Sequence, residues 1–358
     1  MLFSEKLLRW YEEYGRDLPW RRTEDPYRIW LSEIILQQTR IEQGMDYWYR
    51  FVEKYPTVGA LAEASEEEVL KLWQGLGYYS RARNLHAAAR YIHNELKDMF
   101  PNTYKEILGL KGVGRYTAAA IASFAYRLPY PVIDGNVYRL VARLRGIDTP
   151  IGTDKAYGEF EAVLRNLMDR ERPDLFNQAM MDFGSMQCKP VGSNCEVCVF
   201  RDECVAYEKG KVHLLPVKGA SVKVRDRYFY YFDVQWTEEG EIMTLLKQRK
   251  EKDIWKGLYE FPMVESERAL VEEEILREGE RLMMEISTEA AEGMRVGEEM
   301  RHKLSHQTIH ASFVRVNLRN GDRLNGEKWQ KMTVEEAKSK PISRLIDRYL
   351  KKKDATSF

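Results

Sequence analysis

The four cysteines of this 358-residue chain constrain its fold more than any other feature. Six, two and five residues separate consecutive members of the set, which consists of Cys188, Cys195, Cys198 and Cys204. Disulfides are rare in the cytosol, where such a tight group more often binds metal. Four thiolates can hold a zinc ion or a [4Fe–4S] cluster. Zinc usually needs two short Cys-x-x-Cys knuckles, and here only Cys195 and Cys198 form one. The spacing therefore favours iron–sulfur and leaves zinc open.

The chain changes character after these cysteines. Residues 1–207 carry apolar side chains at three- and four-residue spacing, for example Val69, Leu72 and Trp73, which predicts helices. Residues 210–222 lack a periodic pattern and contain Pro216 and Gly219, as linkers do. Beyond them come strand-like runs and helical stretches: strands at 227–236, 241–248 and 309–318, and helices at 265–286 and 341–350. We predict a mainly α domain over 1–209, a linker over 210–223 and an α+β domain over 224–358.

Charge is balanced overall but not locally. The chain has 56 basic and 56 acidic residues, yet residues 71–145 hold twelve Lys and Arg against four Asp and Glu. Such a segment either attracts a polyanion or forms a solvated basic surface. There is no apolar run of membrane length and no secretion signal at the start. We expect a soluble, monomeric protein in the cytoplasm, alongside the nucleoid.

A glycine-rich turn joins two helical stretches at residues 110–120. Gly112 and Gly114 permit a sharp turn with positive φ and leave backbone N–H groups open to a phosphate. Lys111 and Arg115 add positive charge. The element suits a grip on a DNA backbone that ignores sequence, although an ordinary glycine-capped connection has the same pattern.

Two acidic residues stand in unusual surroundings. Glu33 lies in 29–36, where six of eight residues are apolar, so we expect a buried carboxyl that keeps its proton near neutral pH, as a general acid must. The alternative is a Glu paired with Arg28 or Arg40. Asp134 stands where an apolar run ends and a helix begins, the position of an N-cap. Capping N–H groups would keep it ionised, and one protonated and one ionised carboxyl can together cleave a glycosidic bond.

These features occur together and in an order that resembles the helix–hairpin–helix DNA glycosylases, the superfamily that includes endonuclease III. Within it, the chain looks like the adenine DNA glycosylases (the MutY family). The matching stretches are 18–21, 32–39, 75–81, 112–117 and 133–137. In that group, six-two-five spacing of four cysteines is the mark of a [4Fe–4S] cluster, which the resemblance therefore implies here.

Tyr116 separates the subfamilies. Endonuclease III relatives carry a lysine at this position, which attacks the sugar as an amine and permits strand cleavage. Because a phenol cannot form that imine, we predict a monofunctional glycosylase.

The resemblance also implies a substrate and a set of site residues. The substrate is adenine mispaired with 8-oxoguanine or guanine in duplex DNA. Glu33 would protonate the base, Asp134 would stabilise the sugar cation, and Tyr116 and Asn136 would help to position groups. The matching pocket positions are Trp20, Arg21, Leu36 and Gln178, and the positions that wedge into the duplex are Gln38, Leu76 and Tyr78.

The second domain resembles the Nudix-like domain of the same family at residues 255–262. In that family this domain checks the base opposite adenine through a Phe-Ser-His loop. Here the loop reads Leu304, Ser305, His306. Ser305 and His306 can supply polar contacts to 8-oxoguanine, whereas the leucine weakens any aromatic contribution. The glycine and the glutamate-rich helix of true Nudix hydrolases are missing, so we do not expect nucleotide hydrolysis.

Three alternatives remain from the sequence. One is an enzyme of the same fold that excises a damaged pyrimidine or nicks DNA. Another is a non-catalytic binder of damaged DNA. A third is a hydrolase of oxidised nucleotides that works through the second domain.

Overall fold

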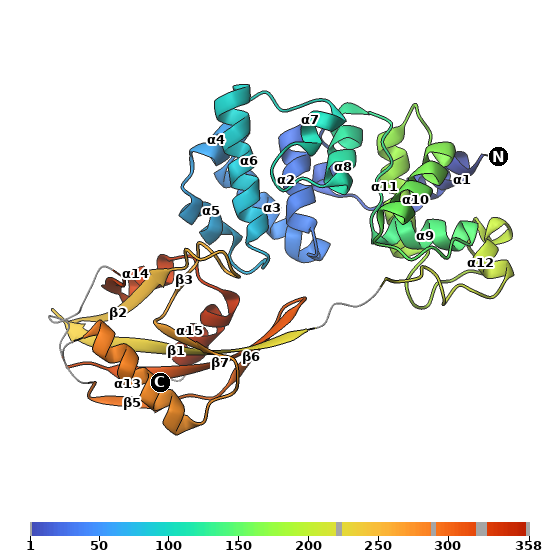
Figure 1. Ribbon diagram of the computed structural model, residues 1–358. Coiled ribbons are helices and arrows are strands. Elements are labelled where there is room, and N and C mark those ends of the chain that lie inside the picture. Colours follow the sequence, from blue (N-terminus) through green and yellow to red (C-terminus); the bar gives the residue numbers. More distant parts are fainter. Residues whose placement is uncertain (1, 220–223, 288–290, 320–327, 356–358) are drawn as a thin grey trace. The chain divides into compact units, whose positions relative to one another are not determined.

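The computed structural model describes residues 2–219, 224–287, 291–319 and 328–355 and divides into two compact units (Figure 1). The first comprises Met1–Glu63 and Asn84–Ser221, and the second Ala64–Arg83 and Val222–Phe358. Part of the predicted linker, 220–223, lies outside the described residues. Its earlier part is attached to the first unit, where the Ile151 N–H donates to the Val217 carbonyl at 2.9 Å.

The described residues of the first unit form helices, as their periodicity predicts. Its α-helices are α1 (Phe3–Tyr14), α2 (Pro26–Leu36), α3 (Ile41–Lys54), α4 (Val58–Glu63), α6 (Ser80–Leu96), α7 (Tyr104–Leu108), α8 (Arg115–Tyr126), α9 (Gly135–Arg145), α10 (Asp154–Leu167), α11 (Pro173–Met186) and α12 (Val205–Glu208). Two 3-10 turns, η1 (Pro19–Arg21) and η2 (Arg201–Glu203), complete the list, and α6 begins within the 64–83 segment of the second unit.

Packing in the first unit brings α2, α8, α9 and α11 together. An apolar core unites α1, α9, α10 and α11 around Val137, Phe160 and Phe183, all fully buried. Helix α2 packs against α3 and α8. Asp25 caps α2 by accepting the Tyr27 N–H at 2.9 Å, and Pro26 occupies the first turn, where its missing N–H costs nothing.

The second unit is built on a twisted mixed sheet. Its strands are β1 (Arg225–Glu238), β2 (Glu241–Gln248), β3 (Tyr259–Glu260), β4 (Met263–Ser266), β5 (Gly293–Val296), β6 (Met300–Lys303), β7 (Gln307–Asn317) and β8 (Gln330–Thr333). The order is β3-β2-β1-β7-β5, with β4 on β1, β6 on β7 and β8 on β2. Its helices are α5 (Glu66–Trp73), α13 (Glu272–Ile286), α14 (Val334–Ser339) and α15 (Arg344–Ala355).

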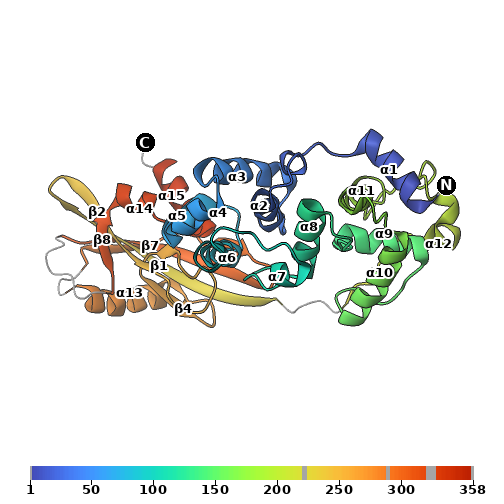
Figure 2. The same cartoon turned by 90° about the horizontal axis from the view of Figure 1, so that it is seen from above.

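Strands β1 and β7 form the parallel centre of this sheet and are covered on both faces (Figure 2). Phe232 and Val316 face α13, whereas Phe313 stacks on Tyr349 of α15 with ring centroids 4.0 Å apart. Burial on both faces explains why β1 reads as a nearly continuous apolar run.

The mainly α and α+β classes predicted for the two parts are confirmed, with corrections at element ends. The strand at 241–248 is β2, whereas the run at 309–318 is β7, which begins at Gln307. The acidic helix was placed too early, because 263–266 pairs with β1 as β4. The last helix begins at Arg344 because Ile342 forms a bridge with Tyr259 instead.

Candidate active site

Glu33 lies in the third turn of α2 and is 6% exposed. Its neighbours along the helix are apolar, as the sequence predicted. Burial raises the pKa of Glu33 to about 7 from the ordinary 4.5, against a hydrogen bond from Tyr116 and the charge of Arg21. A carboxyl with this pKa holds its proton in a large fraction of molecules at neutral pH.

Tyr116 stands in the first turn of α8 and connects the two acidic residues. It shares a hydrogen bond with Glu33, and burial together with the charges of Glu33 and Asp134 raises its pKa well above the ordinary value. Its phenol therefore stays protonated and serves as a donor.

Asp134 is the N-cap of α9, as expected. One carboxylate oxygen accepts the Val137 N–H at 2.7 Å and the other accepts the Asn136 side-chain amide at 2.8 Å. Burial nevertheless raises the pKa of Asp134, and the capping bonds oppose this rise without reversing it. The charge of Asp134 contributes to the rise in the pKa of Glu33, and both carboxyls raise the pKa of Tyr116, so the structure brings the two predicted acids into one group.

Sequence reasoning missed Asp182 on α11, which binds the predicted pocket residue Arg21. Asp182 is fully buried and accepts two hydrogen bonds from Arg21, at 2.7 and 2.8 Å. It also accepts the Arg16 N–H at 2.9 Å. Burial works to raise the pKa of Asp182, but the bonds from Arg21 and Arg16 outweigh it and the pKa is lowered. One helical turn separates Asp182 from Gln178, a spacing that indicates a shared face.

Arg139 of α9 ties the Asp134 end of the group to the cysteine loop. Its guanidinium donates to the Asn136 side-chain oxygen at 2.9 Å, to the Gly184 carbonyl at 2.5 Å and to the Cys188 carbonyl at 2.7 Å. A chain of bonds thus runs from Asp134 through Asn136 and Arg139 to the first cysteine.

The remaining predicted pocket residues lie on neighbouring elements of the first unit. Trp20 is buried in an edge-to-face contact with Trp48, their centroids 5.8 Å apart. Gln178 is buried and accepts the Tyr11 hydroxyl at 2.8 Å. Leu36 is half-buried at the end of α2, and Gln38 follows it in an exposed turn with φ of +56°.

The glycine turn between α7 and α8 is exposed but differs in detail from the expectation. Gly112 has φ of +81°, whereas Gly114, the N-cap of α8, is extended at φ −97°. Lys111 is exposed, and Arg115 forms an ion pair with Asp154 at 2.8 Å. The positive end of α8 thus opens to solvent beside Lys111.

The predicted duplex contacts of the second unit lie on two separate turns. Tyr78 is 44% exposed with φ of +48°, while Leu76 is only 8% exposed. Ser305 and His306 are exposed in the turn from β6 to β7, where their side chains lie 3.0 Å apart.

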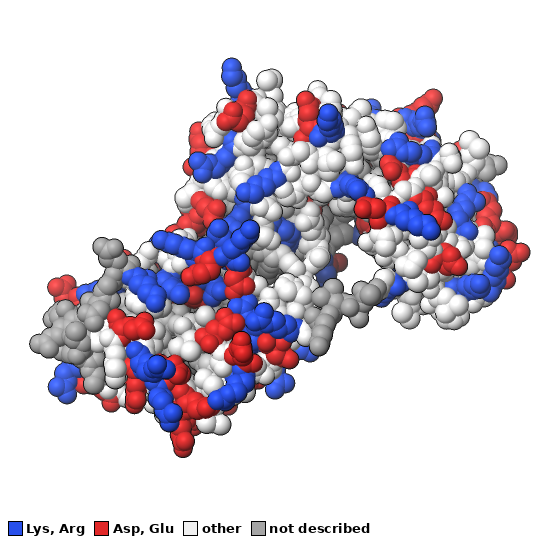
Figure 3. Space-filling view, in the orientation of Figure 1, with Lys and Arg blue, Asp and Glu red and all other residues white. Residues whose placement is uncertain are grey.

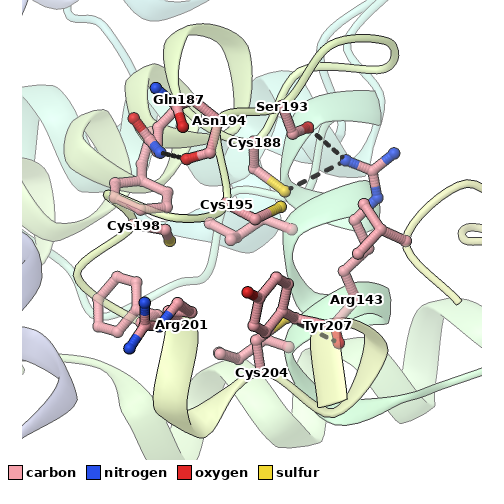
Figure 4. A pocket seen from close by; sticks show the side chains of 15 residues that line it. Arg143, Gln187, Cys188, Ser193, Asn194, Cys195, Cys198, Arg201, Cys204 and Tyr207 are labelled. Atoms are coloured by element: carbon pink, nitrogen blue, oxygen red, sulfur yellow. Dashed lines mark hydrogen bonds between the residues drawn. The ribbon is translucent and has the colours of Figure 1, made fainter. Parts of the chain in front are cut away.

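The four cysteines line one pocket in the loop between α11 and α12 (Figure 4). Arg143 donates to the Cys188 sulfur at 3.5 Å, the Lys189 carbonyl at 2.7 Å and the Ser193 hydroxyl at 3.0 Å. Among the described residues, no three His, Cys, Asp or Glu side chains are placed to hold a single metal ion. The four side chains predicted to hold a cluster therefore line one pocket without being gathered around a single point.

Neither sign of charge dominates the face of the molecule drawn in Figure 3. Figure 3 shows basic and acidic side chains interspersed over the face that it draws. The helices of the described residues are all too short or too polar to cross a membrane.

The chain is similar to known families and proteins of DNA repair. Residues 31–166 match the family described as HhH-GPD superfamily base excision DNA repair protein, and residues 234–352 match the NUDIX domain. The adenine DNA glycosylase of Buchnera aphidicola subsp. Acyrthosiphon pisum is 32% identical over 319 residues, which cover 88% of this chain and 87% of that protein. The adenine DNA glycosylase of Homo sapiens is 40% identical over 227 residues, 61% of this chain and 42% of that protein.

Two solved structures resemble the helical part. A thermostable thymine-DNA glycosylase superposes with a TM-score of 0.54 at 29% identity, covering 58% of this chain and 95% of that one. An endonuclease III–DNA complex superposes with a TM-score of 0.51 at 22% identity, covering 58% and 94%. At that identity, the second likeness concerns the fold alone.

Proposed function

Because the chain belongs to the adenine DNA glycosylases of the HhH-GPD superfamily, we propose that it hydrolyses the glycosidic bond of adenine mispaired with 8-oxoguanine or guanine in duplex DNA. Its membership makes it a DNA N-glycosylase of base excision repair. The mispair and the purely hydrolytic outcome are our inference. The observation that carries the proposal is the buried Glu33, with a pKa of about 7, in one group with Asp134.

The residues suit an acid-assisted departure of the base. An extruded adenine is protonated by Glu33 on its five-membered ring and leaves as a neutral molecule. The sugar then carries positive charge, which Asp134 stabilises before water adds. Asn136 holds one Asp134 oxygen, and Tyr116 holds Glu33. We assign four residues to the base pocket: Trp20, Arg21, Leu36 and Gln178.

Tyr116 supports the hydrolytic outcome. An imine with the sugar requires an amine, and a phenol that keeps its proton is neither an amine nor a ready nucleophile. We therefore infer that strand cleavage is left to other enzymes.

Contacts to the duplex complete the proposal. Gln38, Leu76 and Tyr78 are assigned to the wedge that fills the vacated space, and Lys111, Gly112, Gly114 and Arg115 to the phosphate grip. Ser305 and His306 supply polar contacts to the base opposite adenine. The protein is proposed to act as a monomer on DNA in the cytoplasm.

We assign the cysteine pocket to a [4Fe–4S] cluster held by Cys188, Cys195, Cys198 and Cys204. These four residues would hold the cluster, which would supply redox-active iron when bound. A brown preparation whose visible absorbance disappears in Cys198→Ser supports this assignment, and a colourless protein that contains stoichiometric zinc contradicts it.

An end-labelled duplex with 8-oxoguanine opposite adenine tests the function directly. We expect strand breaks only after hot alkali, and no breaks at all with Glu33→Gln. The same assay over a panel of mispairs measures selectivity. Nicks without alkali, or full activity of Glu33→Gln, contradict the proposal.

A further inference from the structure

We propose that the second unit also positions the duplex wedge, by holding α5 and the loop at 75–78 on β3 and on residues 338–342. This inference rests on the proposed function, which assigns Leu76 and Tyr78 to the wedge. It gives the Nudix-like fold a second task besides reading the opposite base.

Within the second unit, helix α5 is attached to β3 and to residues 338–340 through two of its charged side chains. Glu67 accepts the Tyr259 hydroxyl at 2.9 Å and the Lys340 ammonium at 2.8 Å. One turn further on, Lys71 donates to the carbonyls of Lys338 and Lys340, at 2.6 and 3.1 Å. Lys71 is partly buried, so its bonds form where water competes weakly.

The stretch at 255–262 supplies a surface shaped for this helix. Gly257 has φ of +84°, and a Cβ there would lie 2.9 Å from the Leu70 side chain. Next to it, the Lys256 carbonyl accepts the Arg83 guanidinium at 2.5 Å. The positive φ disfavours any residue other than glycine here, and a side chain would also displace the end of Leu70 on α5.

The loop after α5 is attached at both ends to the backbone of Ile342. The Ile342 N–H donates to the Gln74 side chain at 3.2 Å, and the Ile342 carbonyl accepts the Tyr79 hydroxyl at 3.3 Å. That hydroxyl also accepts the Gly75 N–H at 3.4 Å. Both residues that flank 75–78 are therefore bonded to the backbone of one residue of the second unit, Ile342.

Within this frame, Tyr78 is the exposed element. The Arg81 guanidinium donates to the Gly77 carbonyl at 3.2 Å and lies 5.6 Å from the centre of the Tyr78 ring. The Trp73 indole donates to the same carbonyl at 3.0 Å. The loop thus presents one aromatic ring from a fixed backbone, which suits insertion between bases.

The test follows base extrusion in the full-length protein, using 2-aminopurine in place of adenine opposite guanine. The hydrogen bonds that hold α5 and the loop on β3 and on residues 338–342 are called the brace. Tyr79→Phe and Lys71→Met remove bonds of this brace and keep the shape of each side chain. Together they remove the four hydrogen bonds named above, and we expect the equivalent of one or two of these bonds to bear on the position of the loop. The extrusion equilibrium should therefore fall roughly fivefold to tenfold. Tyr230→Phe and Lys331→Met are matched controls, because they remove the bonds to Leu270 and Glu238 in the same unit.

A double-mutant cycle with Tyr78→Ala separates positioning from general stability. If the brace acts through the Tyr78 ring, the brace substitutions lose most of their effect once that ring is absent. Suppose that Tyr78→Ala impairs extrusion. The inference is then overturned if the effects of the brace substitutions and of Tyr78→Ala simply multiply, or if the brace variants behave like the control variants. An unimpaired Tyr78→Ala overturns the wedge assignment itself, and the brace with it. If circular dichroism shows that the variant with both brace substitutions is misfolded, Tyr79→Phe alone decides.

Discussion

At the scale of single residues, the chemistry depends on which of the two carboxyls holds a proton. Glu33 is buried among apolar side chains, whereas Asp134 accepts a backbone and a side-chain N–H. Burial raises both pKa values, but the bonds oppose the rise at Asp134. Glu33, with a pKa of about 7, can therefore hold a proton near neutral pH, while the hydrogen bonds to Asp134 favour its ionised form.

The rate of base release should reflect this division. Because Glu33 must be protonated and its pKa is about 7, the single-turnover rate should fall as pH rises through that value. The rate should fall again at low pH, where Asp134 gains a proton. Rates measured from pH 4 to 9 with excess enzyme check this, and a rate that stays flat above pH 8 contradicts the role of Glu33.

The same pKa predicts a gain in stability when Glu33 loses its charge. The folded-state pKa of about 7 exceeds the ordinary 4.5, so the contribution of Glu33 is complete below 4.5 and is lost as pH rises through 7. Glu33→Gln should therefore be more stable than the parent at pH 8, by at most about 3 kcal/mol, and not at pH 4. Urea denaturation at both pH values measures the difference.

Asp182→Asn should be costly because it leaves two cations beside a neutral amide. Breaking a buried ion pair costs about 3 to 5 kcal/mol. Arg21 then acts on Glu33 without its counter-charge, so the alkaline limb of the pH–rate profile should move to lower pH. Asp17→Asn, which breaks an exposed pair with Arg22, is the control and should change stability little. Equal losses in the two variants contradict this account.

Sequence alone located the two acids but not their supports. Glu33 was visible because a charge inside an apolar helix is rare, and Asp134 because it precedes a helix. Asp182 and Arg139 occupy ordinary helical positions, and their roles depend on partners more than 40 residues away, namely Arg21 and Cys188. Such pairings arise only when η1 and α9 lie against α11 and the loop that follows it.

At the scale of elements, the two glycines of the turn at 110–120 should respond differently to substitution. At Gly112, φ of +81° strains any side chain, and a Cβ would lie 2.6 Å from that of Asn84. Gly112→Ala should destabilise the protein by about 2 kcal/mol and weaken duplex binding. Gly114→Ala meets open space and should cost about 1 kcal/mol or less. Denaturation curves and binding isotherms of both variants provide the comparison.

Element prediction succeeded where periodicity is long and failed where pairing decides. The helices of the first unit and strand β2 follow from their patterns. Strands β3 to β6 and β8 span only two to four residues each, and they exist because β1, β2 and β7 offer them partners. The assignment of 64–83 to the second unit has no local signal either, because Glu67 and Lys71 find their partners nearly 200 or more residues away.

At the scale of the whole molecule, a chain without net charge must bind a polyanion through local fields. Each phosphate that a lysine neutralises releases counterions, so the affinity falls with salt in proportion to the number of such contacts. Lys111 lies beside the positive end of α8, and Lys111→Ala should reduce the slope of log K against log salt by about 0.9. Lys331→Ala should leave the slope unchanged, because Lys331 pairs with Glu238. Binding isotherms at several salt concentrations decide the matter: equal slopes for Lys111→Ala and the parent would mean that Lys111 neutralises no phosphate.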